Sequence, residues 1–442
     1  MKKSRLQLVS CLIVLTLFLV LIGCSNNGTT SSSNQSSGSS TKNEGTNNTK
    51  GNVENELVTV KFANFSGSGE AAHALEQMKV QFEALNPTIE IDIETLGYDE
   101  YFTQMQTRVA SGSAPDAYEL NYENFVSYAK KGVLASLDNY DIDSKNSYET
   151  AINAFQTDGK QFGLPASFSN VVLIYNKDLF DQAQVAYPTS DWTWKELDEA
   201  AVKIRVLGED IFGLFKPIQF HEFYKTVAQN GGNLLSPDGK TFTVNTPENI
   251  ATLQVMADRI NVSNVMPSDA QLSGMGDWDL FKSGRLGMIV TGIWAFPDFT
   301  QNISFNWDIA VEPGNTQKAT HFFANGYVIN ADSKTKDAAF KWISFMSSSQ
   351  QAANIRVDAN WELPAVTYQD VQEKYLSITP PDNREAVFES LNYLVTPPVI
   401  EQFTEMQDIL VQHLSKAAQG ATTAEQALND AQKELESRIK LN

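Results

Sequence analysis

The amino-acid sequence predicts an α/β protein with two lobes. The chain has 442 residues, which is more than a single hydrophobic core usually organises. From residue 57 onward, short apolar runs with the period of a strand alternate with longer runs that have the period of a helix. This alternation is typical of parallel strands joined by helical crossovers. A polar tract of low complexity comes before, so the globular body is expected to begin at residue 57.

The first 23 residues have the pattern of a signal peptide. Basic residues at positions 2, 3 and 5 precede a stretch from 6 to 22 that carries no charge. A membrane-spanning helix is the alternative, but it usually needs about 20 apolar residues and has no cleavage signal. The sequence Leu-Ile-Gly-Cys that ends at Cys24 resembles the bacterial lipobox, in which the chain is cut before the cysteine. We therefore predict a lipoprotein signal peptide at 1–23 and lipidation of Cys24, with palmitate among the acyl groups.

Residues 24–56 are predicted to be the lipidated cysteine and a disordered polar linker. Small polar residues dominate the tract, and they cannot bury enough apolar surface to fold. Acyl chains on Cys24 would hold the protein at the membrane, and the linker would reach on the order of 30 Å. The expected location is the extracellular face of the cell membrane of a Gram-positive bacterium. Cleavage would also remove Cys11, so no disulfide is expected.

Five elements, in the order strand, helix, strand, helix, strand, open the globular body. Apolar and polar residues alternate over 57–65 and again over 89–95, which predicts two strands. Apolar residues at helical spacing lie between them, and the Asn-Pro pair at 86–87 predicts the end of that helix. A second helix should end at the Ser-Gly pair 111–112, before a third strand.

The carboxyl ends of these strands supply the first candidates for a ligand site, because open α/β sheets bind ligands at that edge. The residues that follow the three strands are Asn64, Phe65 and Ser66, then Gly97 and Tyr98, then Asn121, Tyr122 and Glu123. Only one or two loops of a sheet normally reach a ligand, so an ordinary surface loop is the alternative at each position.

Two helix starts are predicted from their capping residues. Thr193 and Glu196 have the spacing of a capping box, and Trp192 is placed to pack against the helix as a hydrophobic staple. The tryptophans of this segment are therefore expected to be structural. Thr422 and Glu425 have the same spacing at the start of a final amphipathic helix. The apolar positions of that helix are Ala427, Leu428, Ala431 and Leu435.

Composition and missing motifs argue against several classes of function. A net charge of -20 disfavours nucleic acid and anionic lipid surfaces as partners. The chain has no nucleophile elbow, phosphate loop or dinucleotide-binding glycine turn. The stretch from His221 to Lys225 resembles a zinc-protease motif but ends in lysine instead of histidine. We expect no catalytic residue, cofactor or metal. A glycosidase acid pair stays open, because such pairs are defined by distance in space.

Several segments, taken in order, resemble the bacterial family 1 extracellular solute-binding proteins. The most specific matches are QFGLPASFSNVVLIYNKDLFDQA at 161–183 and YPTSDWTWKEL at 187–197. The others are SGSAPDAYELNY, FKSGRLGMIVTGIW, EPGNTQKATHFFANGYVIN, KTKDAAFKWISFMSSSQQ and QGATTAEQAL. The resemblance covers nearly all of residues 57–440. This family includes maltose-binding protein and the sugar-binding lipoproteins of ATP-driven importers.

The resemblance implies the two-lobed periplasmic-binding-protein fold of type II, in which each lobe is a mainly parallel sheet flanked by helices. By this resemblance the chain would cross between the lobes near Ser167, 323–326 and Val371. The amino-terminal lobe would comprise 57–167 and 324–371, and the carboxy-terminal lobe 168–323 and 372–442. The lobes would close around a ligand by a hinge, since a ligand that contacts both favours the closed state.

The resemblance also implies ligand-binding residues. The positions that match the family's site are Asn64, Phe65, Ser66, Tyr122, Glu123, Ser169, Asn170, His221 and Trp294. Asn325, in the second crossing, is a further candidate. Two tryptophans of maltose-binding protein are missing here, at Leu120 and near Gln407. These departures argue against maltose itself and leave the carbohydrate class in place.

Trp294 is expected to stack on a sugar ring, because a flat aromatic face suits the C–H face of a sugar. It follows an apolar strand and a glycine, which is where the strand-end rule places ligand residues. A tryptophan of the core is the alternative. Trp278 and Trp361 are further candidates, with partial burial in the core as the competing interpretation.

The sequence thus predicts a monomeric receptor without catalytic activity that captures an extracellular sugar or oligosaccharide. It would deliver its ligand to the permease of an ABC importer, whose ATPase must be a separate chain because no phosphate loop is present. Three alternatives stay open. They are another solute, such as a polyol, a peptide or a sugar phosphate, a ligand-sensing role beside a histidine kinase, and a glycoside hydrolase.

Overall fold

The computed structural model of the chain describes residues 57–398 and 400–441. The predicted signal peptide, the lipidation site Cys24 and the linker 24–56 lie outside the described residues. The described residues belong to one compact unit. Among the described helices, none combines the length and the apolar character needed to cross a bilayer.

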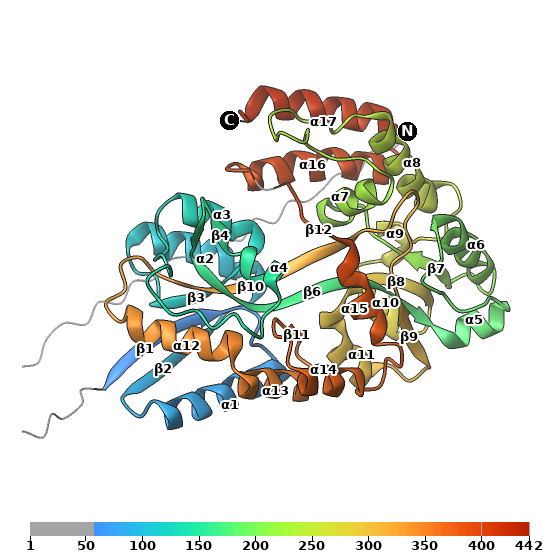
Figure 1. Cartoon of the computed structure of the whole chain (residues 1–442). Coiled ribbons are helices and arrows are strands. Elements are labelled where there is room, and N and C mark those ends of the chain that lie inside the picture. The colour runs from blue at the N-terminus through green and yellow to red at the C-terminus, as the bar shows by residue number, and fades with distance from the viewer. Residues whose placement is uncertain (1–56, 399, 442) are drawn as a thin grey trace, which may run out of the picture. The chain divides into compact units, whose positions relative to one another are not determined.

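The first five elements confirm the predicted alternation of strands and helices (Figure 1). They are β1 (Val58–Asn64), α1 (Glu70–Leu85), β2 (Ile89–Thr95), α2 (Tyr98–Ser111) and β3 (Ala117–Asn121). The strand β1 pairs in parallel with both β2 and β3. The carboxyl ends of these strands therefore share one edge of the sheet, and α3 (Tyr122–Lys130) begins directly after β3.

Two long strands connect the halves of the sheet. They are β6 (Gly163–Asn176) and β10 (Thr320–Ile329), which pair antiparallel in the order β2-β1-β3-β10-β6-β8-β7. The first half of β6 pairs with β10, and its second half pairs with β8 (Leu286–Gly292) and β9 (Trp307–Ala310). Every residue of β6 is buried, as expected for a strand covered on both faces. Asn325 of β10 lies opposite Ser167 of β6, so the segments predicted to cross between the lobes near Ser167 and at 323–326 are paired side by side. The lobe boundaries remain a prediction.

Helices cover both faces of the sheet (Figure 1). The remaining helices are α4 (Glu149–Asn153), α5 (Lys177–Ala183), α6 (Trp194–Arg205), α7 (Phe220–Gln229), α8 (Pro247–Asn261), α9 (Asp269–Leu272), α10 (Asp277–Lys282), η1 (Ile293–Ala295), α11 (Phe296–Asn302), α12 (Lys336–Ser348), α13 (Gln350–Asp358), α14 (Gln369–Leu376), α15 (Glu385–Ser390), η2 (Leu391–Tyr393), α16 (Phe403–Ala418) and α17 (Ala424–Arg438). The remaining strands are β4 (Gln156–Thr157), β5 (Lys160–Gln161), β7 (Phe212–Phe215), β11 (Leu363–Pro364) and β12 (Leu394–Val395).

Segments far apart in the sequence build one part of the core together. The helices α12 and α13 pack against α1, next to β1 (Figure 1). The indole of Trp342 lies 5.9 Å from the ring of Phe62 and 5.1 Å from that of Phe82, measured between centroids. Edge-to-face packing of such large buried rings stabilises the contact between these elements.

The two predicted helix starts have different outcomes. The capping box of Thr193 and Glu196 is confirmed at the start of α6. The predicted box of Thr422 and Glu425 is wrong by one residue, because Thr423 is the cap and accepts a hydrogen bond from the backbone N–H of Gln426 at 3.1 Å. Adjacent threonines offer the same chemistry in two registers, and packing selects the second. The four predicted apolar positions of α17 are buried as expected.

Candidate functional site

A cleft of about 960 Å³ opens beside the carboxyl ends of the strands. Its aromatic lining residues are Phe65, Tyr98, His221, Trp278, Trp294, Phe323 and Trp361. Its carboxylates and side-chain amides are Asn121, Glu222, Asp277, Asp298, Gln219, Gln301, Asn325, Glu362 and Gln407. Broad aromatic faces interspersed with hydrogen-bonding groups are typical of sites for polar organic ligands.

The cleft brings together most of the residues that the sequence singles out. The predicted residues in its lining are Phe65, Ser66, Tyr98, Asn121, His221, Trp278, Trp294, Asn325 and Trp361. The predicted residues outside its lining are Asn64, Gly97, Tyr122, Glu123, Ser169 and Asn170. The first set comes from loops, from helices, from the end of β3 and from the middle of β10, in segments far apart in the sequence, so only the fold makes them neighbours.

Trp294 lies on η1, directly after β8, as the strand-end rule predicts. Its ring is half-buried and meets the ring of Phe323 edge to face, with 4.9 Å between the centroids. A Cβ atom on Gly292 would collide with the indole of Trp294, so only glycine fits at position 292. The indole therefore rests against bare backbone on one side and against Phe323 on the other.

Trp361 is held at another part of the cleft by a cation and a strained turn. The guanidinium of Arg356 lies 3.9 Å from the centroid of its ring. Asn360 and Glu362, on either side, adopt left-handed φ angles of 52° and 45°, which cost free energy for residues other than glycine. Glu362 accepts a hydrogen bond from the hydroxyl of Ser167 on β6, which fixes this turn against the central strands.

Trp278 lies at the start of α10. Its indole N–H donates a hydrogen bond to the hydroxyl of Thr291 on β8, at 3.3 Å. The ring of Phe299 meets its ring edge to face at 5.5 Å between centroids. With its polar atom satisfied, the rest of the indole borders the cleft as apolar surface.

The loop after β1 is organised by the buried carboxylate of Glu119. This carboxylate accepts hydrogen bonds from the backbone N–H groups of Phe65 and Ser66 at 3.2 and 3.1 Å, and from the Ser66 hydroxyl at 2.9 Å. Burial raises the pKa of Glu119 to about 7, although the bonds from Ser66 act in the opposite direction. Asn64 accepts a hydrogen bond from the Gly67 N–H at 2.8 Å, so it shapes the loop from behind.

The other predicted side chains outside the lining are buried or half-buried. Ser169 and Asn170 are buried on β6, and the side-chain amide of Asn170 donates to the carbonyl oxygen of Val387 at 2.7 Å. Tyr122 is half-buried at the start of α3, where burial raises its pKa. Glu123 is buried beside two histidines, described below.

Comparison with known proteins places this geometry in a family. The sequence profile of the family described as bacterial extracellular solute-binding protein matches residues 66–353. The chain belongs to this family. A solved structure, the ABC substrate-binding protein Lmo0181 from Listeria monocytogenes in complex with cycloalternan, is 46% identical with a TM-score of 0.82, over 86% of this chain and 99% of that chain. The two-lobed periplasmic-binding-protein fold of type II predicted from the sequence is thereby confirmed.

Curated relatives of this solute-binding protein are more distant. The maltooligosaccharide ABC transporter solute-binding lipoprotein of Streptococcus pneumoniae is 24% identical, over 75% of this chain and 78% of its own. The maltodextrin-binding protein MdxE of Bacillus subtilis is 22% identical, over 83% of this chain and 87% of its own. The predicted membership of the solute-binding family agrees with these relatives.

Several lining residues of this solute-binding protein escaped prediction from the sequence. Asp277 and Glu362 border the cleft directly beside the predicted tryptophans 278 and 361, and burial raises the pKa of both carboxyl groups. Their adjacency to those tryptophans is the one signal that could have identified them. Gln407 also lines the cleft, although the family resemblance indicates only a missing tryptophan near this position.

Buried charges fix α7, the helix that carries His221. The carboxylate of Glu312 pairs with Lys216 at 2.8 Å and with Lys225 at 2.7 Å, and Lys225 also pairs with Glu222 at 2.7 Å. Burial alone would raise the pKa of Glu312, but the two lysines outweigh it and lower this pKa. The amide of Gln229 donates to Glu312 at 2.9 Å, which ties the end of α7 to the same group.

Proposed function

We propose that this chain is the substrate-binding lipoprotein of an ABC importer and that it captures an extracellular carbohydrate in the cleft. The observation that carries the proposal is the lining itself, where Trp278, Trp294 and Trp361 surround a volume of about 960 Å³ together with carboxylates and amides. Such a volume is of the size that holds an oligosaccharide.

The chemistry of the lining suits sugars better than other solutes. The C–H face of a pyranose is apolar and packs on an indole, while its hydroxyl groups need hydrogen-bond partners on the rim. Asp277, Glu362 and Asn325 supply acceptors and donors near the tryptophans. The described lining residues include no lysine or arginine, which disfavours sugar phosphates as ligands.

The relatives narrow the proposed ligand. The similar Listeria protein binds cycloalternan, and the more distant relatives are named for maltooligosaccharides and maltodextrin. We propose an oligosaccharide of the cycloalternan type as the ligand. By the resemblance, maltose-binding protein has tryptophans at the position of Leu120 and near that of Gln407, and their absence here supports a ligand other than maltose.

The remaining parts of the proposal follow from the sequence. They are the lipid anchor at Cys24, the extracellular location on a Gram-positive cell, the monomeric state, and delivery to a permease with a separate ATPase. The proposal also includes the absence of catalysis, because capture requires that the ligand leave unchanged. The predicted lobe boundaries and hinge belong to it as well.

A stability screen with product analysis tests this function. Thermal unfolding of the full chain in detergent is followed with cycloalternan, maltotriose and glucose, and with a tripeptide, mannitol and glycerol phosphate as controls. A ligand that binds only the native state raises the midpoint. We expect a rise with cycloalternan and recovery of the intact carbohydrate by chromatography. A rise with the tripeptide alone would refute the carbohydrate class, and hydrolysed products would indicate a glycosidase.

A further inference from the structure

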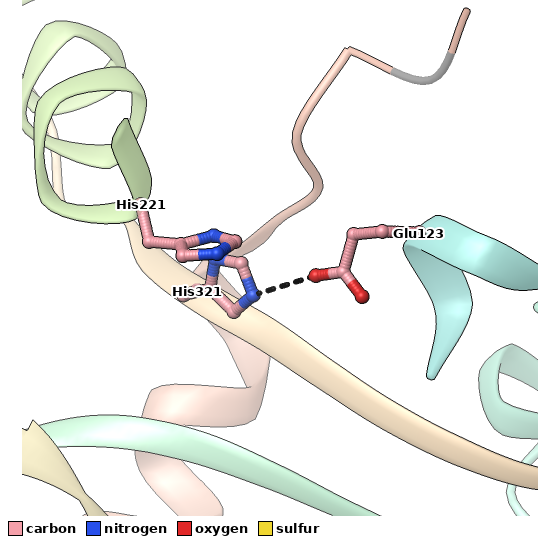
Figure 2. Close-up of side chains that lie close together, drawn as sticks. All are labelled: Glu123, His221 and His321. Atoms are coloured by element: carbon pink, nitrogen blue, oxygen red, sulfur yellow. Dashed lines mark ion pairs between the residues drawn. The ribbon is translucent and has the colours of Figure 1, made fainter. Parts of the chain in front are cut away.

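Three side chains from separate elements converge beside the cleft. Figure 2 shows Glu123 from the start of α3, His221 from α7 and His321 from β10. Each offers one atom able to bind a metal ion, and these atoms all lie within 4.8 Å of one another. Glu123 and His321 are 4% and 1% exposed, so water solvates neither group freely. His321 is the member that sequence patterns did not identify.

The polar atoms of this cluster are not satisfied by the protein. Glu123 Oε1, His221 Nδ1 and His321 Nε2 are all buried without a hydrogen-bond partner in the part of the chain that the structure describes. A buried polar atom without a partner is destabilising, so three such atoms at one place are unusual. The distance between Glu123 Oε1 and His321 Nε2 is 3.5 Å, as the dashed line in Figure 2 marks.

Tyr224 contacts the ring nitrogen of His321 that faces away from Glu123. The phenol of Tyr224 lies against Nδ1 of His321 and is 3.4 Å from the carbonyl oxygen of Val395. When Nδ1 donates to the phenol oxygen and the phenol donates to Val395, a lone pair is left on Nε2. This lone pair faces the Glu123 carboxylate, another acceptor, and two acceptors at this distance need a shared cation or proton between them.

We propose that Glu123, His221 and His321 bind a divalent transition-metal ion, and that Zn²⁺ suits them best. Two imidazole nitrogens and one carboxylate oxygen form a ligand set typical of zinc, with a fourth position for water or a ligand atom. In a tetrahedral site with bonds of about 2.0–2.1 Å, neighbouring ligand atoms lie roughly 3.3 Å apart. The Glu123–His321 distance of 3.5 Å is close to this value.

The surroundings are consistent with metal binding. Burial lowers the pKa of His221 to about 4 and that of His321 well below its usual value. The contact of Nδ1 with Tyr224 fixes the ring of His321, as outer hydrogen bonds do in metal sites. Lys225 is the nearby cation that opposes a metal, and Glu222 and Glu312 offset its charge.

A metal ion here would connect parts of the chain that are distant in sequence. Glu123 lies on α3, directly after β3, and β3 pairs with the end of β10. His221 lies on α7, and His321 lies at the start of β10. His221 also lines the cleft, so the ion would lie next to the proposed ligand site. The proposal does not depend on the identity of the carbohydrate.

Calorimetric titration with ZnCl₂ tests the site. The full chain is used without a histidine tag, after treatment with a chelator, and with Cys11→Ser and Cys24→Ser in every sample so that thiols do not compete. We expect one Zn²⁺ per chain. Glu123→Gln and His321→Gln should each weaken binding by at least about tenfold, as should Tyr224→Phe through loss of the outer hydrogen bond. Co²⁺ in place of Zn²⁺ should give the visible absorption of tetrahedral coordination.

The matched control is the other histidine–glutamate pair of the described chain. The buried His413 has its Nε2 2.9 Å from Oε2 of the partly exposed Glu434, and no third metal-binding group joins them in the described residues. His413→Gln should leave zinc affinity unchanged. Far-UV circular dichroism in the presence of chelator establishes whether each variant is folded. If another variant is not folded, the zinc affinity of Glu123→Gln decides the test, because glutamine is nearly isosteric with glutamate. Absence of saturable zinc binding, or binding that survives Glu123→Gln and His321→Gln, would overturn the proposal.

Discussion

The indole of Trp294 owes its position to two neighbours. Phe323 meets it edge to face, and Gly292 leaves room for the ring where any side chain would collide with it. The strand β8 ends at this glycine, so the turn that follows delivers the indole to the cleft. The position of Trp294 at the cleft therefore depends on Gly292, two residues earlier in the chain.

Glu119 gives a prediction on pH dependence. Its pKa is raised from the usual 4.5 to about 7, first by burial. Below pH 4.5 the carboxyl is protonated in both folded and unfolded chains, so its contribution to stability is then fully present. As the pH rises from 4.5 through about 7, the unfolded chain loses the proton first and that stability is lost. The loss is on the order of 3 kcal/mol, since each pKa unit corresponds to about 1.4 kcal/mol.

Urea unfolding of the wild type and of Glu119→Gln at pH 5 and pH 8 measures this effect. Subtracting the variant removes the contributions of the other carboxyl groups. The free energy of unfolding of the wild type, relative to the variant, should be larger at pH 5 than at pH 8. A difference that is independent of pH would show that Glu119 titrates as an ordinary exposed carboxyl.

At the scale of elements, α7 is fixed by the buried ion cluster around Glu312. Glu312→Gln would leave Lys216 and Lys225 without their shared anion, and breaking a buried pair in this way costs about 3–5 kcal/mol. Urea unfolding at neutral pH measures this loss. The control is Glu389→Gln, because Glu389 is half-exposed and lies 3.5 Å from Lys318, so its pair should contribute about 0–1 kcal/mol. Equal small losses in both variants would contradict the structural role of the cluster.

The start of α17 provides a second test at this scale. Thr423 accepts the hydrogen bond from the Gln426 N–H, whereas Thr422 precedes the cap. Thr423→Ala should lower the free energy of unfolding by about 1 kcal/mol, and Thr422→Ala should change it by much less. Chemical denaturation of the two variants distinguishes the registers. A larger loss of unfolding free energy for Thr422→Ala than for Thr423→Ala would show that Thr422 is the cap, as the sequence predicts.

At the scale of the molecule, periodicity and strand-end geometry made much of the fold and part of the site predictable. The first βαβαβ unit follows from apolar spacing. Trp294 was a candidate by the family resemblance, and its position after a strand and a glycine supported that candidate. Patterns along the chain could not identify Glu362, whose role comes from contact with Ser167 on a distant strand. They also missed His321, because its partners Glu123 and His221 come from two other elements. The capping residue predicted for α17 was wrong by one position, because Thr422 and Thr423 have the same capping chemistry and only the packing of the folded chain distinguishes them.

Carbohydrate capture by the tryptophans of the cleft is tested most directly by calorimetric titration of the wild type and Trp294→Ala with cycloalternan. Trp192→Ala is the matched control, because Trp192 stacks on Phe180 at 6.2 Å between centroids and does not line the cleft. We predict saturable binding to the wild type and to Trp192→Ala, and at least tenfold weaker binding to Trp294→Ala, equivalent to about 1.4 kcal/mol or more. Unchanged affinity in a folded Trp294→Ala protein would contradict the proposed stacking.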